Sequence, residues 1–384
     1  MRHTILNVGA FELYNCIIKK QHQNFVKRYC SDKAPYTLEK PKLIHPYRKL
    51  HPWKSLEKFS QYLLNNIIYN KDGFVVINKP YGISARHQNI NKDVFKFHST
   101  VPDETDYTLS DGIPFIAKTL GYPELVIVKT PEKFMSGVTL LAADEKIQEA
   151  INYSYVKSVG MNFLNKIYWI ITTRQPRQIE GKEHLRQVIL PSITILQSEP
   201  SFQIVVISDS WSKNEEKQRK VKILNVQFNV ISNSTNNLSS LIEIKASTIK
   251  WHALRLFAST RLYSPILGDN IYANRIHKIG GKWLLANPFT IEYRLPEVDR
   301  QLLELLHLSK AKQELIPCHI HARQVILPSF LGEESLTLEA PLIPPFDWTC
   351  KQLKFKNIPD HISLHVYIPK DLENYISVWL CKRI

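Results

Sequence analysis

Short apolar runs rich in β-branched residues recur along most of this chain, and they constrain its fold more than any other feature. Turn-forming residues separate the runs, and each run has the length of a strand rather than of a helix. A chain with many short strands and few long helices is predicted to fold as a sheet-dominated α+β protein. The strands expected from these runs are Phe74–Ile77, Leu125–Val128, Val138–Ala142, Ile167–Thr172, Ile193–Gln197, Gln203–Ser208, Lys222–Ile231 and Leu241–Ala246.

The other local patterns predict one helix and two enlarged loops. Apolar residues at helical spacing predict a helix over Leu56–Ile67, with a turn after it at residues 70–73. The polar stretches 209–220 and 232–240 have too few apolar residues to pack, so we expect strand-connecting loops there. With 384 residues and 44% apolar content, the chain can bury a large core in one large domain or two smaller ones.

The first residues have the character of a targeting segment. Up to Cys30, the chain has several basic residues and a single acidic one, Glu12, and its apolar residues recur at roughly helical spacing. We therefore expect a mitochondrial transit peptide over residues 1–33 and import into the mitochondrial matrix, with an ordinary basic tail as the alternative. Residues 34–54 are rich in proline and basic residues and are expected to form a linker or surface strap. No run reaches the roughly 18 apolar residues that a membrane span requires.

Charge and cysteine content narrow the class of partner and the compartment. The formal net charge of +15 and the pI near 9.4 favour a polyanionic partner, although net charge alone does not establish nucleic-acid binding. The five cysteines form no CxxC pair, and their odd number suits a reducing compartment. Neither a disulfide framework nor a zinc site is indicated.

One carboxylate stands in a context that favours chemistry. Glu132 precedes a small-residue turn at Ser136–Gly137, and the buried strand expected over Val138–Ala142 would hold the preceding loop against the core. Such a carboxylate can be a nucleophile, a general base or only an ion-pair partner. The residues alone leave these three roles open.

Three segments stand out in order along the chain: GFVVINKPYGIS at Gly73–Ser84, TPEKFMSGVTLLAADEK at Thr130–Lys146, and TIKWHALRLFASTRLYSPILGDNIYAN at Thr248–Asn274. Together they resemble the RluA-type pseudouridine synthase family, whose segments read roughly NKPaG, HRLDxxTSG and THQIRxHLxxxGxPIxGDxxYG. The resemblance runs from about Trp53 to about Phe355. Within the family, the chain looks most similar to the divergent mitochondrial members found in animals.

The resemblance implies both a fold and an activity. The fold is a single pseudouridine synthase domain, over residues 55–384 here, with a mixed, mostly antiparallel sheet and a central RNA-binding cleft. The activity is isomerisation of uridine to pseudouridine in RNA, in which the base is flipped into the site and no metal or organic cofactor is needed. The implied partner is mitochondrial mRNA or rRNA, and the sequence names no protein partner.

The resemblance also assigns catalytic residues. Glu132 lies at the position of the family's catalytic aspartate. Tyr168, in KIYWIITT, matches the tyrosine that stacks on the flipped uracil, with packing in the core as the alternative. Arg255 matches the arginine that pairs with the catalytic carboxylate and keeps it ionised, with a structural ion pair as the alternative. Asp269 in the closing GD motif is expected to accept hydrogen bonds from nearby backbone amides.

Three further residues are expected to bind RNA. Lys79 of NKPYG is expected at the edge of the cleft, where it binds a phosphate or supports the site, or is simply a surface lysine. Lys129 is a candidate for a phosphate contact, and His252 precedes Arg255 in the third segment. The pair His319 and His321 could suggest metal ligation, but no third ligand is near in sequence, so this segment is interpreted as scaffold.

The departures from the family motif keep a second hypothesis open. Where the family has His-Arg-Leu-Asp, this chain has Lys129-Thr130-Pro131-Glu132, so the arginine that helps to extrude the base is lost and the carboxylate is one methylene longer. A positional error of about 1 Å in a catalytic group can cost about 10²-fold in rate. Because Tyr168, Arg255 and the closing signature with Gly268, Asp269 and Tyr272 are retained, the chain is still predicted to be a mitochondrial RNA pseudouridine synthase. The alternative is a catalytically impaired RNA-binding factor in mitochondrial ribosome or transcript maturation.

Overall fold

The computed structural model describes residues 44–87, 101, 104–190, 204–289, 295–332, 334–356 and 358. Residue contacts divide the chain into two units, Met1–Ile44 and His45–Ile384, and the second unit holds the fold described below. The expected transit peptide at 1–33, residues 34–43 of the expected linker, and the expected strand Ile193–Gln197 lie outside the described residues.

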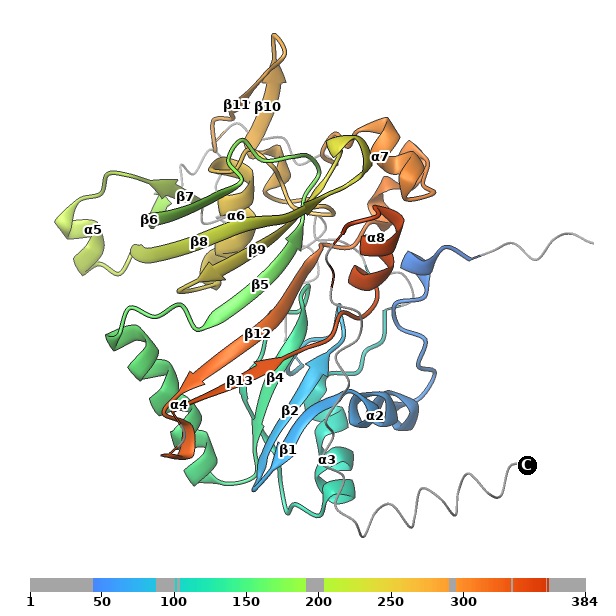
Figure 1. Cartoon of the computed structure of the whole chain (residues 1–384), viewed down its shortest axis with the longest axis vertical. Coiled ribbons are helices and arrows are strands. Elements are labelled where there is room, and N and C mark those ends of the chain that lie inside the picture. Colours follow the sequence, from blue (N-terminus) through green and yellow to red (C-terminus); the bar gives the residue numbers. More distant parts are fainter. Residues whose placement is uncertain are drawn as a thin grey trace, which may run out of the picture. The chain divides into compact units, whose positions relative to one another are not determined.

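The described strands form a large mixed sheet and a separate two-stranded hairpin, β10–β11 (Figure 1). In the large sheet the strand order is β1-β2-β4-β12-β5-β9-β8-β6-β7, with β3 paired to β4 and β13 paired to β12. Among the described pairs, β4 with β12 is parallel and the others are antiparallel. The strands are β1 (Ile67–Lys71), β2 (Phe74–Lys79), β3 (Val126–Lys129), β4 (Ser136–Ala142), β5 (Lys166–Ile171), β6 (Glu180–Leu190), β7 (Ile204–Ser208), β8 (Val221–Asn233), β9 (Ser240–Ala246), β10 (Ile276–Ile279), β11 (Lys282–Leu285), β12 (Ile320–Pro328) and β13 (Ser335–Glu339).

Helices cover both faces of this sheet (Figure 1). Alternate residues of β5 serve the two faces, because side chains of a strand point to opposite sides in turn. Tyr168 and Ile170 pack in the cluster that contains α6, whereas Ile167, Trp169 and Ile171 pack in the cluster that contains α7 and α8. The helices are α2 (Leu56–Asn65), α3 (Leu109–Leu120), α4 (Glu145–Gly160), α5 (Lys213–Lys217), α6 (Ala253–Thr260), α7 (Arg300–Leu305) and α8 (Phe346–Gln352).

Strand β4 changes partner along one edge, and this creates a fork in the sheet. Strand β2 pairs with β4 along its other edge over residues 137–142. On the forked edge, β12 pairs with Ser136 and Gly137, whereas β3 pairs with residues 140–142. The loop from β3 to β4, residues 130–135, therefore begins and ends beside this fork.

Gly137 permits the close approach of β4 and β12. Its φ of +116° lies in a region that side chains with a Cβ rarely adopt, and a Cβ built there would stand 2.2 Å from the carbonyl oxygen of Ala322. No other residue type fits this point without moving the backbone. The Ser-Gly step that follows the Glu132 loop is thus a requirement of the sheet fork.

The structure confirms the predicted α+β class and most of the predicted strands. Seven of the eight expected strands correspond to β2, β3, β4, β5, β7, β8 and β9, with ends shifted by a few residues. No described helix combines the length and the hydropathy needed to cross a bilayer. The predicted central cleft stays a prediction, since the sheet order alone does not demonstrate one.

Three local predictions need correction. The helix over Leu56–Ile67 ends at Asn65, because Asn66 caps it and Ile67 pairs with Ile77 as the first residue of β1. The polar stretch 209–220 contains α5, whose start is stabilised by a capping box between Ser212 and Glu215. Residues 45–54 of the expected linker belong to the compact unit that begins at His45, because Tyr47, Leu50 and Trp53 are buried.

Candidate functional site

Glu132 lies in a loop that several backbone contacts hold in place. Pro131 restricts the backbone just before it, and the N–H of Met135 donates to the carbonyl of Glu132 at 3.1 Å, closing a turn. The N–H of Gly82 donates to the carbonyl of Lys133 at 2.9 Å, which ties the loop to the turn after β2. Since β4 is buried along its length, the loop is anchored on a rigid strand.

Lys79 is a second anchor of this loop, which corrects the prediction that it binds RNA phosphate. The residue is fully buried, and its ammonium donates to the carbonyls of Pro80 at 3.2 Å, Ile83 at 2.9 Å and Lys133 at 3.4 Å. Burial lowers the pKa of Lys79 to about 7, with Lys133 lowering it further and Glu132 opposing the shift. Lys79 therefore supports the site from inside and does not face solvent.

Replacing Lys79 by methionine is expected to slow the reaction of the site about tenfold, while the free energy of unfolding at pH 7 changes little. Methionine removes the three contacts that bind the Glu132 loop but also removes the cost of burying an ammonium. A loop displaced by less than 1 Å should cost less than the ~10²-fold that a full 1 Å costs. The rate of the reaction at the site and urea denaturation measure the two effects. Lys71→Met, at an exposed lysine on β1, is the matched control. A large loss of stability with unchanged turnover in the folded fraction would contradict this assignment.

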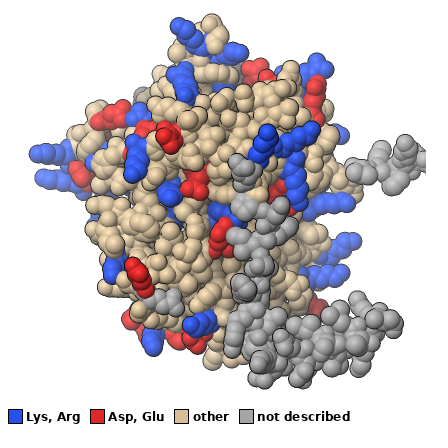
Figure 2. Space-filling view, in the orientation of Figure 1, with Lys and Arg blue, Asp and Glu red and all other residues tan. Residues whose placement is uncertain are grey.

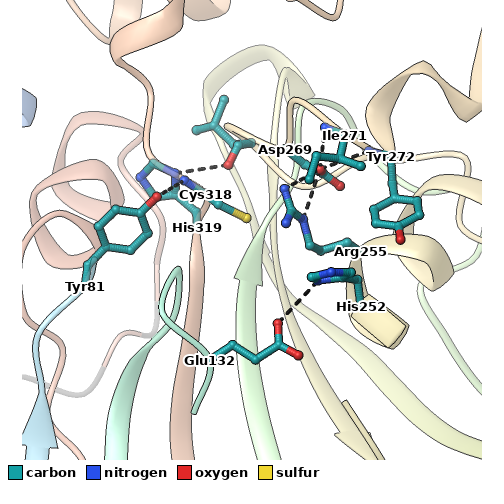
Figure 3. A network of polar contacts seen from close by, with 10 residues as sticks. Tyr81, Glu132, His252, Arg255, Asp269, Ile271, Tyr272, Cys318 and His319 are labelled. Atoms are coloured by element: carbon teal, nitrogen blue, oxygen red, sulfur yellow. Dashed lines mark hydrogen bonds and ion pairs between the residues drawn. The ribbon is translucent and has the colours of Figure 1, made fainter. Parts of the chain in front are cut away.

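The carboxylate of Glu132 points toward His252 (Figure 3). The two atoms Glu132 Oε2 and His252 Nδ1 are 3.4 Å apart, and the side chains are 35% and 36% exposed. His252 follows Trp251 in a short turn, Lys250–His252, where Trp251 and His252 both have positive φ, 56° and 54°. Two successive left-handed residues cost on the order of 1–2 kcal/mol each, and such strain concentrates at functional sites.

Buried groups around Glu132 respond to its charge. Burial raises the pKa of the Tyr272 phenol and of the Cys318 thiol to about 12, and the negative charge of Glu132 contributes to both shifts. The pKa of Tyr168 is raised by burial first, with smaller contributions from Tyr155 and Glu132. Glu132 is thus within electrostatic reach of groups from β5, from the segment after α6 and from the segment just before β12, although these segments are far apart in the sequence.

Tyr168 is the neighbour of Glu132 that the sequence predicted, but its ring is not open for stacking. Only 4% of the residue is exposed, and it packs in the core cluster that contains α6. Strand β5 places it between Ile244 of β9 and Ala322 of β12. In this structure the ring packs in the core, as the alternative expected, so a base could lie on it only if its neighbours moved, and the stacking role stays a prediction.

Arg255 pairs with Asp269 and not with Glu132, which corrects the second predicted contact. Its Nε and Nη2 donate to Asp269 Oδ1 at 3.0 and 2.7 Å, and the two side chains are 3% and 0% exposed. The same oxygen accepts the N–H groups of Ile271 and Tyr272 at 3.0 and 3.1 Å, which confirms the predicted role of Asp269 (Figure 3). Burial alone would lower the pKa of Arg255, but Asp269 reverses this and raises it.

Two buried histidines, His319 just before β12 and His321 within it, bond to the scaffold, and His321 does so at the sheet fork. His321 Nε2 lies 3.2 Å from the carbonyl of Ala340, so it carries the proton, and Nδ1 accepts from the Ser136 hydroxyl at 2.8 Å. His319 contacts Thr349 Oγ1 through Nε2 at 2.7 Å. Burial lowers their pKa values to about 4 for His319 and about 3 for His321. Both rings are neutral near pH 7, and each is engaged by the scaffold.

These two buried histidines predict a loss of stability in mild acid. The unfolded chain protonates them near pH 6.5 and the folded chain only near pH 4 and 3, so the stability they contribute is present above 6.5 and is lost as the pH falls. Together they are expected to lower the free energy of unfolding by about 2–3 kcal/mol between pH 7.5 and 5.5, to which His45 and His51 add, because burial lowers their pKa values as well. Urea denaturation at both pH values measures it. His321→Asn should reduce the difference by about half of the 2–3 kcal/mol that the pair contributes, and His307→Asn, at an exposed histidine, should leave it unchanged; an equal effect of both would contradict this account.

The residues that replace the family's His-Arg-Leu-Asp motif make local contacts. The hydroxyl of Thr130 lies 3.0 Å from that of Thr139 on β4, so the position of the lost arginine is occupied by a link within the fork. The ammonium of Lys129 lies over the ring of Tyr155, 5.2 Å from its centroid. Sequence reasoning missed Cys318, whose N–H donates to the Tyr81 hydroxyl at 3.0 Å beside the site (Figure 3), and no sequence signal marks it.

The chain is similar to known proteins over most of its length. No protein-family model matches it. "Mitochondrial mRNA pseudouridine synthase Rpusd3" of Mus musculus is 25% identical over 302 residues, which cover 78% of this chain and 80% of that protein. "Pseudouridylate synthase RPUSD4, mitochondrial" of Homo sapiens is 26% identical over 309 residues, covering 77% and 70% of the two chains.

A solved structure supports the same likeness at the level of the fold. The structure of "Human RNA Pseudouridylate Synthase Domain Containing 4" superposes with a TM-score of 0.56 at 23% sequence identity. The match covers 79% of this chain and 98% of the other chain. At this identity the superposition establishes the fold, and the site must be argued from the residues present here.

Proposed function

From its place among the homologues of the RluA-type pseudouridine synthases, we propose that this chain isomerises uridine to pseudouridine in mitochondrial RNA, with Glu132 as the reacting carboxylate. The mouse relative is named as an enzyme of mitochondrial mRNA. Messenger or ribosomal RNA in the matrix is the proposed substrate, and the basic composition of the chain suits such a polyanion.

The reaction exchanges one bond of the nucleoside for another. The bond between ribose C1′ and uracil N1 breaks, the detached uracil rotates, and a bond forms between C1′ and C5. The hydrogen of C5 leaves as a proton, and N1 gains one, so atoms and charge balance. A carboxylate that acts at the ribose or the base, without metal or organic cofactor, is what this chemistry requires of the protein.

The observation that carries this proposal is the contrast in exposure at the site. Glu132 and His252 are about one-third exposed, whereas Tyr168, Arg255 and Cys318 around them are 4%, 3% and 1% exposed. A carboxylate held on a rigid loop, open to solvent on one side and backed by buried groups on the other, can be reached by a flipped nucleotide. A carboxylate that served only in the scaffold would be expected to pair inside it, as Asp269 does.

The extended side chain of glutamate is compatible with the altered motif. Pro131 and the turn closed by Met135 fix the backbone of Glu132, from which this side chain extends. Lys79 fixes the following residue, Lys133, through a hydrogen bond to its carbonyl. The loop thus has its own anchors and does not depend on the arginine that Thr130 replaces. His252, 3.4 Å from the carboxylate, is the proposed group that orients it or contacts the RNA.

The test is tritium release from mitochondrial RNA transcripts made with uridine labelled at C5. Because the new glycosidic bond forms at C5, each isomerisation sets one tritium free in water. The purified chain is expected to release tritium from a defined uridine without added metal or cofactor. RNA binding without release from any mitochondrial transcript would instead support the catalytically impaired RNA-binding factor.

A further inference from the structure

Four lysines from four separate elements gather beside the Glu132 site. Lys129 ends β3, Lys166 begins β5, Lys222 lies at the start of β8, and Lys250 begins the turn that carries Trp251 and His252. We call these four lysines the lysine track.

Contacts with two aromatic rings place the lysines near one another. The ammonium groups of Lys129 and Lys166 lie over the same ring, that of Tyr155, at 5.2 and 5.8 Å from its centroid. The ammonium of Lys222 lies 3.5 Å from the centroid of the Trp251 ring. Lys166 also donates to the carbonyl of Ser247, just before the Lys250 turn.

The lysines influence each other's charge. Burial lowers the pKa of Lys166 to about 8, and the charges of Lys129 and Lys250 lower it further. The pKa of Lys222 is also lowered, by burial and by Lys250. The four ammonium groups therefore repel one another in the absence of a ligand.

Acidic side chains do not compensate this repulsion. Within the part of the chain that the structure describes, no ion pair joins an Asp or Glu to Lys129, Lys166, Lys222 or Lys250. Lys133, in the Glu132 loop, differs from them in pairing with Glu104. A polyanion with regularly spaced charges would relieve the repulsion.

We propose that the lysine track binds the phosphates of the RNA strand next to the target uridine and leads that strand to Glu132. This inference rests on the proposed function for the identity of the RNA. Lys129 precedes the Glu132 loop directly, and Lys250 lies in the same turn as His252, so the track ends at the site. Trp251 adds an aromatic surface of the kind that single-stranded RNA stacks on.

The basic surface continues beyond Lys222. The segment around α5 carries the exposed side chains of Lys213, Lys217, Arg219 and Lys220. Figure 2 shows basic side chains gathered at the left edge, where Figure 1 places α5. A strand that leaves the site along the track would therefore pass toward α5 and meet positive charge there as well.

Binding of RNA to a catalytically inactive form tests the lysine track apart from catalysis. The full chain carrying Glu132→Gln is titrated into a fluorescein-labelled single-stranded oligoribonucleotide of about 12 nucleotides. Replacing all four lysines by glutamine is expected to weaken binding at least tenfold near 0.1 M salt. The slope of log K against log salt should fall by about 0.7 for each phosphate that the protein no longer neutralises, hence by about 3 in total. Each single variant should lower the slope by about 0.7.

The controls separate charge from structure. The control variant carries glutamine at four exposed lysines elsewhere and should retain most of the RNA affinity and of the salt slope. These lysines are Lys58, Lys71, Lys118 and Lys146. Arginine at the four track positions should retain binding, since the charges remain. Equal affinities and salt slopes for the two glutamine sets would overturn the track. If the wild type releases no tritium but the track variants still bind RNA more weakly, the proposed activity fails and the track stands.

Discussion

Glu132→Gln is expected to lower tritium release from C5-labelled RNA by about 10²–10⁴-fold, the range that a positioned acid or base contributes. Glutamine has nearly the same shape, so the loop held by Pro131, Lys79 and Met135 should keep its place. What is lost is the negative charge that can act on the ribose or base. RNA affinity should change much less than the rate.

Glu124→Gln is the matched control, because Glu124 is an exposed glutamate close in sequence but outside the site. It should release tritium at the wild-type rate. Glu132→Asp is a sharper probe, since the shorter side chain withdraws the carboxylate by about 1 Å and should cost about 10²-fold. Retention of wild-type release by Glu132→Gln would contradict the role of this residue, whatever the other variants do.

Arg255→Leu is expected to lower the free energy of unfolding by about 3–5 kcal/mol, because it leaves the Asp269 carboxylate buried without a cation. Asp269 is 0% exposed, so water cannot replace the guanidinium without opening the core. The shift of the urea midpoint, at constant slope, measures the loss. The size of this effect follows from burial and from the two hydrogen bonds of Arg255 to one oxygen.

A surface ion pair provides the comparison. Arg300 and Glu304 form a pair whose side chains are 91% and 59% exposed, and Arg300→Leu should change stability by less than about 1 kcal/mol. The double variant Arg255→Leu, Asp269→Asn should recover part of the loss, because it removes the isolated charge. Similar small losses for Arg255→Leu and Arg300→Leu would show that the Arg255–Asp269 pair does not hold the site.

Strands were predictable from sequence where the buried residues form a run or an alternation of apolar residues. Strand β2 is buried at every position and β9 at most positions, whereas β8 buries Leu224, Val226 and Phe228 in alternation; all three strands were expected from sequence. Strand β6 was not, because its first half, from Glu180 to His184, consists mainly of polar residues that are exposed or half-buried. The helix α4 was missed as well, since its low amphipathicity gives only a weak periodic signal.

The candidate site was predictable in its residue types but not in its pairings. Family resemblance brought Glu132, His252, Tyr168 and Arg255 together, and the structure places all four near one another. Arg255 pairs with Asp269 because the segment after α6 folds back over the helix. This pairing is a tertiary contact, and no local sequence pattern indicates it.

The buried state of Lys79 and the lysine track depend on tertiary structure in the same way. A lysine next to a turn is normally exposed, and only the carbonyls of two converging loops explain its burial here. The four track lysines come from separate elements, so their proximity follows from strand order.

The most direct test of the central claim is a site-resolved pseudouridine map of mitochondrial RNA from cells that lack this protein, rescued with wild type or with Glu132→Gln. The account predicts that at least one defined pseudouridine is lost, that wild type restores it, and that Glu132→Gln does not. A map that is unchanged by loss of the protein, or a lost site that Glu132→Gln restores as well as wild type does, would contradict it.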